Sequence, residues 1–307
     1  MITIGTDCSG IEAPIAALRQ LKIPHRHLWS CEIDKFARKS IEANYNPETI
    51  FEDITKRDHS KLPDVDIYVC GFPCQPFSLA GRLEGLKDKR SNIMFECIKV
   101  IKAKQPKIFI LENVKNFTSV ENGNVFAFLM KKLKALNRYS ISHCILNTKN
   151  YGIPQNRERL FIIGIRSDLQ HKPFPIPPTI KMQPLRKFID YKDSNDTHSL
   201  NARAVRTLMR FQHKKLSDLD GNYIIATTSF MYAMKNISPT ITTRDDHYIV
   251  LLNRRMSPRE YLNLQGFSKS FKIVVSKSQI VKQAGNSMSV CVLVAIFKEL
   301  QACTNVL

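Results

Sequence analysis

Apolar residues follow two different periods along the first half of the chain. Short apolar runs of strand length alternate with segments in which apolar residues recur every three to four positions, as in amphipathic helices. The expected strands are Ile2–Thr6, His27–Glu32, Asp66–Gly71, Lys107–Glu112, Ser140–Asn147 and Leu160–Arg166. The expected helices are Ile11–Lys22, Lys35–Asn44, Asn92–Lys104 and Val125–Asn137. This alternation predicts an α/β fold with a mainly parallel sheet and helices on both faces.

The pattern changes after Arg166. A proline-rich stretch at 171–178 leads into mixed basic and polar sequence without clear alternation, which indicates a small second domain. Regular patterning returns at Ser257–Leu264, where Ser-Pro-Arg-Glu has the features of a capped helix start. A last apolar helix is expected at Ser289–Gln301. We therefore predict domains at 1–166 and 167–250, with a C-terminal segment, 251–307, that packs back on the first domain.

The chain carries a large positive charge. It has 307 residues, 46 Lys and Arg against 27 Asp and Glu, and a net charge of +19. The excess is spread along the whole chain, which suggests a polyanionic partner such as nucleic acid. A role in solubility or at a membrane surface is the alternative that charge alone leaves open.

The cysteines and the N-terminus point to an intracellular protein. The eight cysteines form no C-x-x-C pair, and no His pair has zinc spacing, so no metal site is expected. Several lie in apolar runs, as reduced buried thiols do. The chain shows no secretion signal and no run of 18 apolar residues, so we expect a cytoplasmic protein that does not enter the membrane.

One cysteine has an unusual setting, in Gly71-Phe-Pro-Cys-Gln-Pro-Phe-Ser78. Cys74 follows the apolar strand ending at Gly71, and the prolines on either side stiffen its backbone. The carboxyl end of a strand is where open α/β sheets bind ligands. Taken alone, a cysteine is more often a small buried hydrophobe.

Other polar residues also follow expected strands. Glu112 ends the strand Lys107–Glu112, where a half-buried carboxylate is suited to share a proton. Arg157 and Arg159 lie two apart, so in an extended segment both guanidiniums point the same way and could clamp a phosphate or carbonyl. The turn 6–12 and Glu32 could face a nucleotide-like ligand. An ordinary solvated surface remains the alternative for each.

Together these segments resemble the DNA cytosine-5 methyltransferase family of bacterial or phage type, in order and over nearly the whole chain. The matching motifs are Pro73-Cys74-Gln75, Asp88–Phe95, Glu112-Asn113-Val114, Gln155–Arg159, Arg259–Phe267 and Gln283–Ser287. The resemblance implies the Rossmann-like fold of methyltransferases that depend on S-adenosyl-L-methionine, with a small target recognition domain. It implies that Cys74 adds to C6 of a flipped cytosine while Glu112 and Arg159 bind the base and Arg157 supports the site.

The resemblance also implies S-adenosyl-L-methionine as the cofactor. The residues it assigns to this cofactor are Cys8, Ser9, Gly10, Ile11, Glu12, Glu32, Ile33, Asp53, Ile54, Pro73, Asn286 and Ser287. The turn departs from the family's Phe-x-Gly-x-Gly-Gly pattern, because Cys8 replaces the aromatic residue and Glu12 and Ala13 replace two glycines. The departure lies in the cofactor turn and leaves the nucleophile motif unchanged.

Duplex DNA is the expected partner. The residues assigned to DNA binding are Gln75, Ser78, Arg90, Arg203, Arg206, Arg210, Lys214 and Lys215, the last five on a helix-like stretch that could also be a solvated basic face. We expect a monomer in a bacterial cell or phage-infected host, with a cognate restriction endonuclease as a further partner if the enzyme belongs to a restriction pair. The alternatives are a tRNA methyltransferase of the same family and a catalytically silent DNA-binding relative. The tRNA branch carries a Cys-Phe-Thr signature, and this chain has no cysteine between Cys144 and Cys291.

Overall fold

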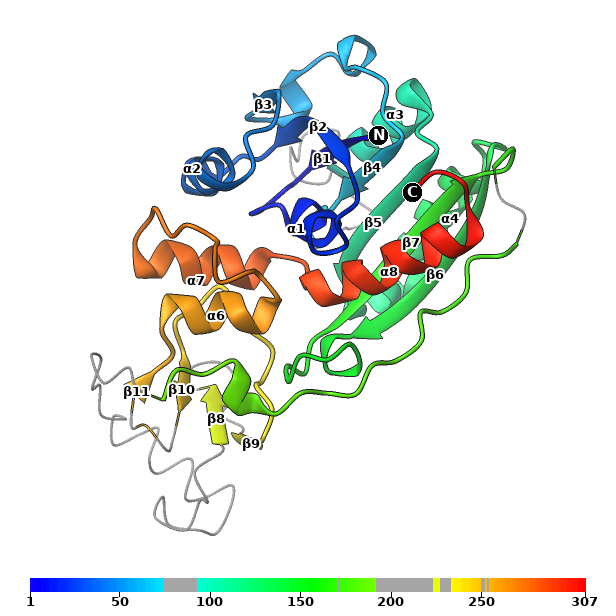
Figure 1. Ribbon diagram of the computed structural model, residues 1–307. Coiled ribbons are helices and arrows are strands. Elements are labelled where there is room, and N and C mark those ends of the chain that lie inside the picture. Colours follow the sequence, from blue (N-terminus) through cyan, green and yellow to red (C-terminus); the bar gives the residue numbers. More distant parts are fainter. Residues whose placement is uncertain (74–92, 170–171, 192–222, 227–232, 250–251, 253) are drawn as a thin grey trace. The chain divides into compact units, whose positions relative to one another are not determined.

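The chain forms two compact units. The computed structural model describes residues 1–73, 93–169, 172–191, 223–226, 233–249, 252 and 254–307 (Figure 1). Unit 1 comprises Met1–Leu146, Glu158–Pro178 and Leu293–Leu307, and unit 2 comprises Asn147–Arg157 and Thr179–Val292. The boundaries predicted from the sequence, at 166/167 and 250/251, describe functional domains and stay a prediction.

Unit 1 is built on a seven-stranded sheet in the order β3-β2-β1-β4-β5-β7-β6. Its strands are β1 Ile2–Asp7, β2 His25–Cys31, β3 Thr49–Phe51, β4 Ile67–Cys70, β5 Ile108–Val114, β6 Tyr139–Asn147 and β7 Glu158–Arg166. Strands β3, β2, β1, β4 and β5 pair in parallel, and β7 pairs antiparallel with β5. The carboxyl ends of the five parallel strands therefore meet at one edge.

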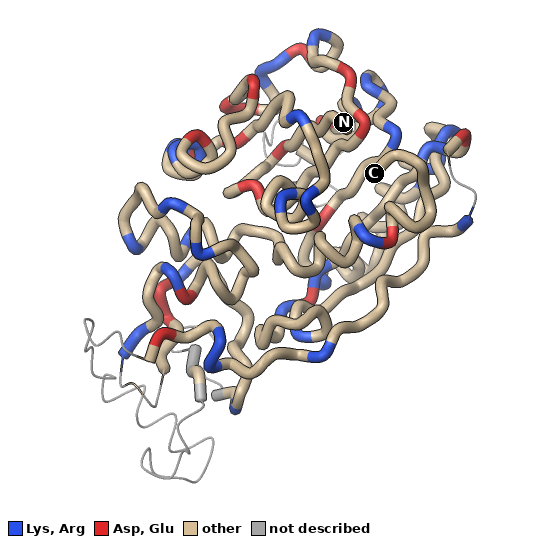
Figure 2. Tube along the Cα trace, in the orientation of Figure 1, with Lys and Arg blue, Asp and Glu red and all other residues tan. Residues whose placement is uncertain are grey.

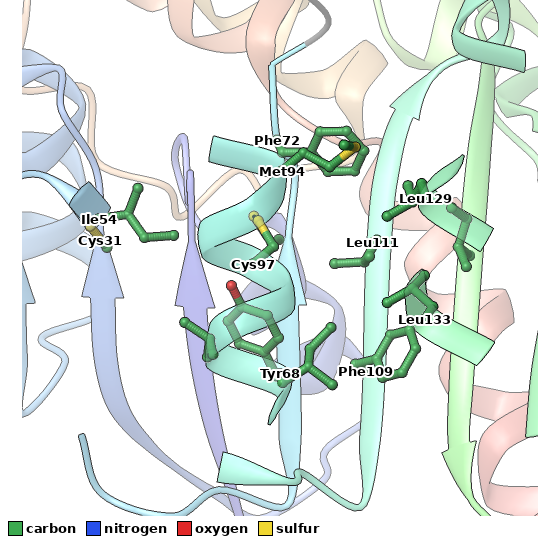
Figure 3. Close-up of a cluster of buried hydrophobic side chains, with 14 of the residues drawn as sticks. Cys31, Ile54, Tyr68, Phe72, Met94, Cys97, Phe109, Leu111, Leu129 and Leu133 are labelled. Atoms are coloured by element: carbon green, nitrogen blue, oxygen red, sulfur yellow. The ribbon is translucent and has the colours of Figure 1, made fainter. Parts of the chain in front are cut away.

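Helices cover both faces of this sheet. They are α1 Ala13–Gln20, α2 Lys35–Asn44, α3 Ile93–Lys104, α4 Asn124–Lys134 and α8 Val290–Cys303. Figure 3 shows the buried cluster that α3 and α4 form with β4 and β5, including Tyr68, Cys97, Phe109 and Leu133. Helices α1 and α8 lie in front of the sheet in Figure 1. Alternate strand residues thus face two apolar layers, which is the environment that near-continuous apolar strands require.

Among its described residues, unit 2 contains a four-stranded sheet in the order β11-β10-β8-β9 and two α-helices that lie wholly within it. The elements are β8 Tyr223–Ala226, β9 Ala233–Lys235, β10 His247–Ile249, β11 Arg254–Arg255, α6 Pro258–Gln265 and α7 Lys277–Asn286. Helix α6 begins with the predicted capping box, because Ser257 accepts the Glu260 N–H and Glu260 accepts the Ser257 N–H. A smaller apolar cluster that includes Tyr261 and Val281 holds the unit together.

The fold predicted from the sequence is confirmed, with local differences. Helix α1 begins at Ala13 instead of Ile11, because Gly10 and Glu12 take left-handed backbone conformations that cannot continue a helix. Strand β3 and helix α7 were not predicted. Strand β3 has only three residues, all at least partly exposed, so its sequence shows no apolar period.

One apolar stretch is long enough to span a membrane. Among the described residues, Lys277–Cys303 passes that test by length and composition, but 78% of its most apolar 18-residue window is buried inside the protein. The stretch covers α7 and α8. Such burial is the pattern of core helices, so its apolar character is accounted for by packing within the protein.

Candidate active site

The predicted site residues of unit 1 gather at the carboxyl edge of the parallel strands. Cys8 follows β1, Glu32 follows β2, Asp53 lies just beyond β3, Pro73 lies beyond β4, and Glu112 is near the end of β5. Parallel pairing places these strand ends side by side. The edge is therefore a shared site, as the position of ligands in open α/β sheets predicts.

The turn from Cys8 to Glu12 has an unusual backbone. Cys8, Gly10 and Glu12 have φ values of 48°, 57° and 59°, in the left-handed region that costs residues with a Cβ free energy. Glu12 is fully buried, and its Oε1 accepts hydrogen bonds from Thr6 Oγ1 at 2.6 Å and from Ser30. These bonds offset the strain, so a glutamate can stand where the family pattern has glycine. The side chain of Glu12 is committed to the interior.

Glu32 links the turn to the end of β2. Its Oε2 accepts the Gly10 N–H at 2.8 Å, and its Oε1 accepts the Asp34 N–H at 2.9 Å. Burial raises the pKa of this carboxyl. A carboxylate can accept about four hydrogen bonds, so each oxygen keeps capacity for a hydroxyl donor. A side chain added at Gly10 would meet no described atom within 4 Å, so the space over the turn is open.

The other residues assigned to the cofactor differ in exposure. Ile33, next to Glu32, is 75% exposed, which is unusual for an isoleucine and offers an apolar surface beside that carboxylate. Asp53 caps the short 3-10 helix η1, Ile54–Lys56, by accepting the Thr55 N–H at 2.9 Å. Ile11 and Ile54 are buried and support the backbone. This set of side chains, with carboxylate acceptors beside an apolar surface and an open turn, fits a ribose and a flat base.

Glu112 and Arg159 form an ion pair across two strands. Arg159 Nε lies 3.2 Å from Glu112 Oε1, with about a tenth of the Glu112 side chain and 16% of the Arg159 side chain exposed. Strands β5 and β7 are antiparallel, with Val114 opposite Arg159 and Glu112 opposite Phe161. The pair is therefore a diagonal neighbour pair on one face of the sheet. It presents a carboxylate and a guanidinium together at the edge where the strands end.

Asn113 fixes the backbone at Phe72, which lies two residues before Cys74 in the sequence. Its Nδ2 donates to the Phe72 carbonyl at 2.9 Å, and the Phe72 ring packs edge-on against Phe117 at 5.4 Å. Both Asn113 and Phe72 are 2% exposed. The backbone two residues before Cys74 is therefore fixed from β5, while Pro73 is exposed at the end of the described segment.

Arg157 has a different environment from the one predicted for it. In unit 2 its guanidinium donates to the carbonyls of Ile241, Gly285 and Ser287 at 2.8 to 2.9 Å, and the residue is 2% exposed. The two-residue spacing predicted one clamp made of Arg157 and Arg159. In the described structure, Arg157 instead joins backbone segments and Arg159 pairs with Glu112. The two side chains differ because backbone carbonyls surround Arg157, whereas Arg159 faces Glu112 on the neighbouring strand. A supporting role for Arg157 in catalysis stays a prediction.

Three sequence motifs of unit 2 meet around Gln155. The Gln155 amide donates to the Leu264 carbonyl at 2.8 Å and accepts the Ile241 N–H at 3.1 Å. Gln265 donates in turn to the Ala284 carbonyl. Gly285 is required here, because a Cβ would lie 2.3 Å from the Thr242 backbone. This network fixes the end of α7, so Asn286 and the buried Ser287 are held by the same contacts that engage Arg157.

Two residues in these networks were missed by sequence reasoning. Asn113 and Gln155 were quoted only as letters of motifs, although each anchors a backbone segment. A buried amide that bonds backbone on both sides gives no apolar period, so only the motif itself could have drawn attention to it.

Several predicted residues lie outside the described part of the chain. They are Cys74, Gln75, Ser78, Arg90, Arg203, Arg206, Arg210, Lys214 and Lys215. Figure 2 shows Lys and Arg distributed over the described parts of both units. In the portion of the chain that the structure describes, no group of three His, Cys, Asp or Glu side chains could hold a metal ion.

Comparison with known proteins matches this arrangement. A family model described as C-5 cytosine-specific DNA methylase matches residues 7–302. The type II methyltransferase M.HaeII of Haemophilus aegyptius is 37% identical over 278 residues, covering 88% of this chain and 84% of that protein. The type II methyltransferase M.BsuFI of Bacillus subtilis is 34% identical over 274 residues, covering 88% of this chain but 65% of the longer relative. The crystal structure of S. pombe Dnmt2 methyltransferase superposes with a TM-score of 0.73 over 98% of this chain and 99% of that one, at 17% identity, which supports the fold alone.

Proposed function

Because this chain belongs to the C-5 cytosine-specific DNA methylase family, we propose that it transfers a methyl group from S-adenosyl-L-methionine to C5 of a cytosine in duplex DNA. The observation that carries the proposal is the ion pair between Glu112 and Arg159, in which Nε lies 3.2 Å from Oε1. This pair lies at the edge of the sheet where the parallel strands end, and β4 is followed there by Pro73 and then, in the sequence, by Cys74. A carboxylate and a guanidinium held together there can grip the polar edge of a pyrimidine.

The chemistry requires a nucleophile from the protein. Cytosine C5 is too weak a nucleophile to attack a methyl sulfonium by itself, so the Cys74 thiolate adds to C6 and makes C5 electron-rich. Glu112 binds the N3 and amino edge, where charge builds, and Arg159 binds O2. When bound, the cofactor supplies the electrophilic methyl group. A base then removes the C5 proton, and the bond between Cys74 Sγ and C6 breaks to release methylcytosine and the thiolate.

The described contacts of unit 1 support cofactor binding at the turn after β1. Glu32 keeps acceptor capacity for ribose hydroxyls beside the exposed Ile33, and Asp53 and the buried Ile54 bring the loop after β3 to the same edge. The backbone of Cys8 to Glu12 faces open space at Gly10. Pro73, Asn286 and Ser287 complete the proposed set, and Asn286 and Ser287 contact the methionine end of the cofactor.

The substrate side is proposed on chemical grounds. A cytosine in a stacked duplex cannot reach a thiol and two base-binding side chains, so the target base is flipped into the site. The basic residues Arg203, Arg206, Arg210, Lys214 and Lys215 bind phosphates or read guanine edges, and Gln75, Ser78 and Arg90 contact the DNA near the flipped base. The relatives named as type II methyltransferases favour a place in a restriction-modification system. We propose a cytoplasmic monomer, with a restriction endonuclease acting on the same DNA site.

Transfer of labelled methyl groups to duplex DNA tests this function. We expect the wild type to label DNA, Cys74→Ser to abolish labelling, and the matched variant Cys144→Ser to leave it intact, because Cys144, half-buried on β6, is not among the residues assigned to the site. DNA binding should weaken steeply with salt as phosphate contacts are lost. Transfer to tRNA alone, or full activity in Cys74→Ser, contradicts the proposal. Sequencing the methylated DNA identifies the recognition site.

A further inference from the structure

A buried cation lies directly beneath the proposed cofactor turn. Arg57 pairs through Nη2 with Asp7 Oδ2, and only 5% of its side chain and none of the Asp7 side chain is exposed. The Arg57 guanidinium also stacks over the Phe51 ring, 5.2 Å from its centroid. Arg57 belongs to no motif identified in the sequence, and Asp7 belongs to the turn 6–12 without a role assigned to it.

Asp7 is the last residue of β1 and immediately precedes the turn Cys8 to Glu12. Its carboxylate also accepts the Tyr68 hydroxyl at 2.7 Å and the Trp29 indole N–H at 3.2 Å. Three donors from β2, β4 and the segment after β3 thus converge on one carboxylate. The end of β1 is held in one orientation from three sides.

Arg57 comes from the other side of the proposed site. It follows η1, the short helix that Asp53 caps, and its partner Phe51 is the last residue of β3. The ion pair therefore ties the loop that carries Asp53 to the turn that carries Cys8 and Gly10. Two segments assigned to the cofactor are joined by a single side chain.

The contacts of Arg57 continue to helix α3. Arg57 Nε donates to His59 Nδ1 at 3.4 Å, and His59 Nε2 lies 2.7 Å from Glu96 Oε2. Glu96 also pairs with Lys99 at 2.8 Å. Helix α3 begins at Ile93, so the chain of contacts reaches from the turn to the element that follows residues 74–92.

Because the ion pair of Arg57 and Asp7 is buried, its main effect is expected on the position of the turn and not on the stability of the fold. Well-packed apolar residues stabilise an interior as well as a buried ion pair does, and they require no fixed geometry. A guanidinium paired with a carboxylate at one strand end does fix geometry. On the basis of the proposed function, we propose that Arg57 is a positioning residue that holds Asp7 and the turn Cys8 to Glu12 in register with Asp53 for cofactor binding.

Calorimetric titration with S-adenosyl-L-methionine, without DNA, tests this role. We expect Arg57→Met to raise the dissociation constant for the cofactor by about 10- to 100-fold, since small misplacements of positioning groups have effects of this size. Arg57→Lys keeps the charge and should recover part of the affinity. In steady-state assays the KM for the cofactor should rise while the KM for DNA stays unchanged, which a general loss of folding would not produce.

A double variant separates position from stability. Asp7→Asn combined with Arg57→Met removes both charges and leaves an amide whose Oδ1 can accept the Trp29 N–H and whose Nδ2 can donate to the Tyr68 hydroxyl, so the melting temperature should recover while cofactor affinity stays weak. Lys107→Met is the matched control, because Lys107 Nζ pairs with Asp66 at 2.8 Å at the opposite end of the strands. Wild-type affinity in Arg57→Met or in the double variant overturns the positioning role. Absence of cofactor binding by the wild type overturns the proposed function itself.

Discussion

Arg159 and Arg157 lie two residues apart and have opposite environments. Arg159, in unit 1, is partly exposed and pairs with the Glu112 carboxylate. Arg157, in unit 2, is buried and donates to three backbone carbonyls from two distant segments. The same residue type in one motif thus pairs with a carboxylate in one unit and with backbone carbonyls in the other.

The difference lies in what each side chain leaves available to a substrate. The side chain of Arg159 is 16% exposed, bonds Glu112 and the Glu158 carbonyl, and lies at the edge proposed for the base. The donors of Arg157 that bond Ile241, Gly285 and Ser287 are committed to the fold. We therefore expect changes at Glu112 to act on catalysis and changes at Arg157 to act on stability.

The largest expected effect is on stability, at Arg157. Arg157→Met removes the donors for three buried carbonyls, which we expect to lower the free energy of unfolding by about 3–5 kcal/mol. Urea denaturation measures the loss. The control is Arg166→Met, because Arg166 pairs with the exposed Asp168 on the surface and should change stability by less than about 1 kcal/mol. Equal stability of Arg157→Met and wild type would show that the carbonyl contacts do not hold unit 2.

The next effect is on catalysis, at Glu112. Glu112→Gln keeps the shape of the side chain and removes the charge that faces the base, so we expect kcat to fall about 10²- to 10³-fold with little change in melting temperature. Single-turnover methyl transfer gives the rate. Glu158→Gln is the matched control, since Glu158 on the neighbouring strand pairs with the half-exposed Lys115 at 2.9 Å. An equal loss in both variants would remove the distinction between the two carboxylates.

A smaller, pH-dependent effect is expected at Glu12, which is buried with incomplete pairing. Its Oε2 has no partner among the described residues, and burial raises the pKa of Glu12 to about 7 from an ordinary 4.5. The folded state therefore binds the proton more tightly than the unfolded state. The stability that Glu12 contributes is full below about pH 4.5 and is lost as the pH rises to about 7, up to about 3 kcal/mol.

Comparison with Glu12→Gln isolates this effect. The difference in unfolding free energy between variant and wild type should shift in favour of the variant from pH 5 to pH 8, as measured by urea denaturation at each pH. Burial lowers the pKa of the neighbouring His27 to about 3, so its own contribution rises with pH from about 3 to 6.5 and appears in both proteins. A difference that stays constant with pH would show that Glu12 is ionised throughout.

The strand ends were predictable from sequence because the parallel sheet leaves a strong pattern. Apolar strands of four to nine residues alternate with amphipathic helices, and the polar residue after each strand then belongs to the shared edge. Glu32 and Glu112 were identified in this way. The three-residue β3 and the unit 2 sheet lack that pattern, so neither was predicted.

Contacts between residues distant in the sequence were the part that could not be predicted. Asn113 reaches Phe72, Gln155 reaches Leu264, and Arg57 reaches Asp7, each as a polar side chain whose partner lies far along the chain. The left-handed Glu12 was also unexpected, because its strain is offset by Thr6 and Ser30 and no local rule predicts that. These residues depend on the folded backbone, which a periodic pattern does not specify.

Trapping the covalent intermediate tests the central claim most directly. Fluorine at C5 of the target cytosine blocks the loss of the C5 substituent, so Cys74 cannot leave after methyl transfer. With S-adenosyl-L-methionine and duplex DNA containing 5-fluorocytosine at the methylated position, we predict a covalent complex whose modified peptide contains Cys74. An active enzyme that forms no such complex, or one attached through another residue, would contradict the assignment of Cys74 as the nucleophile.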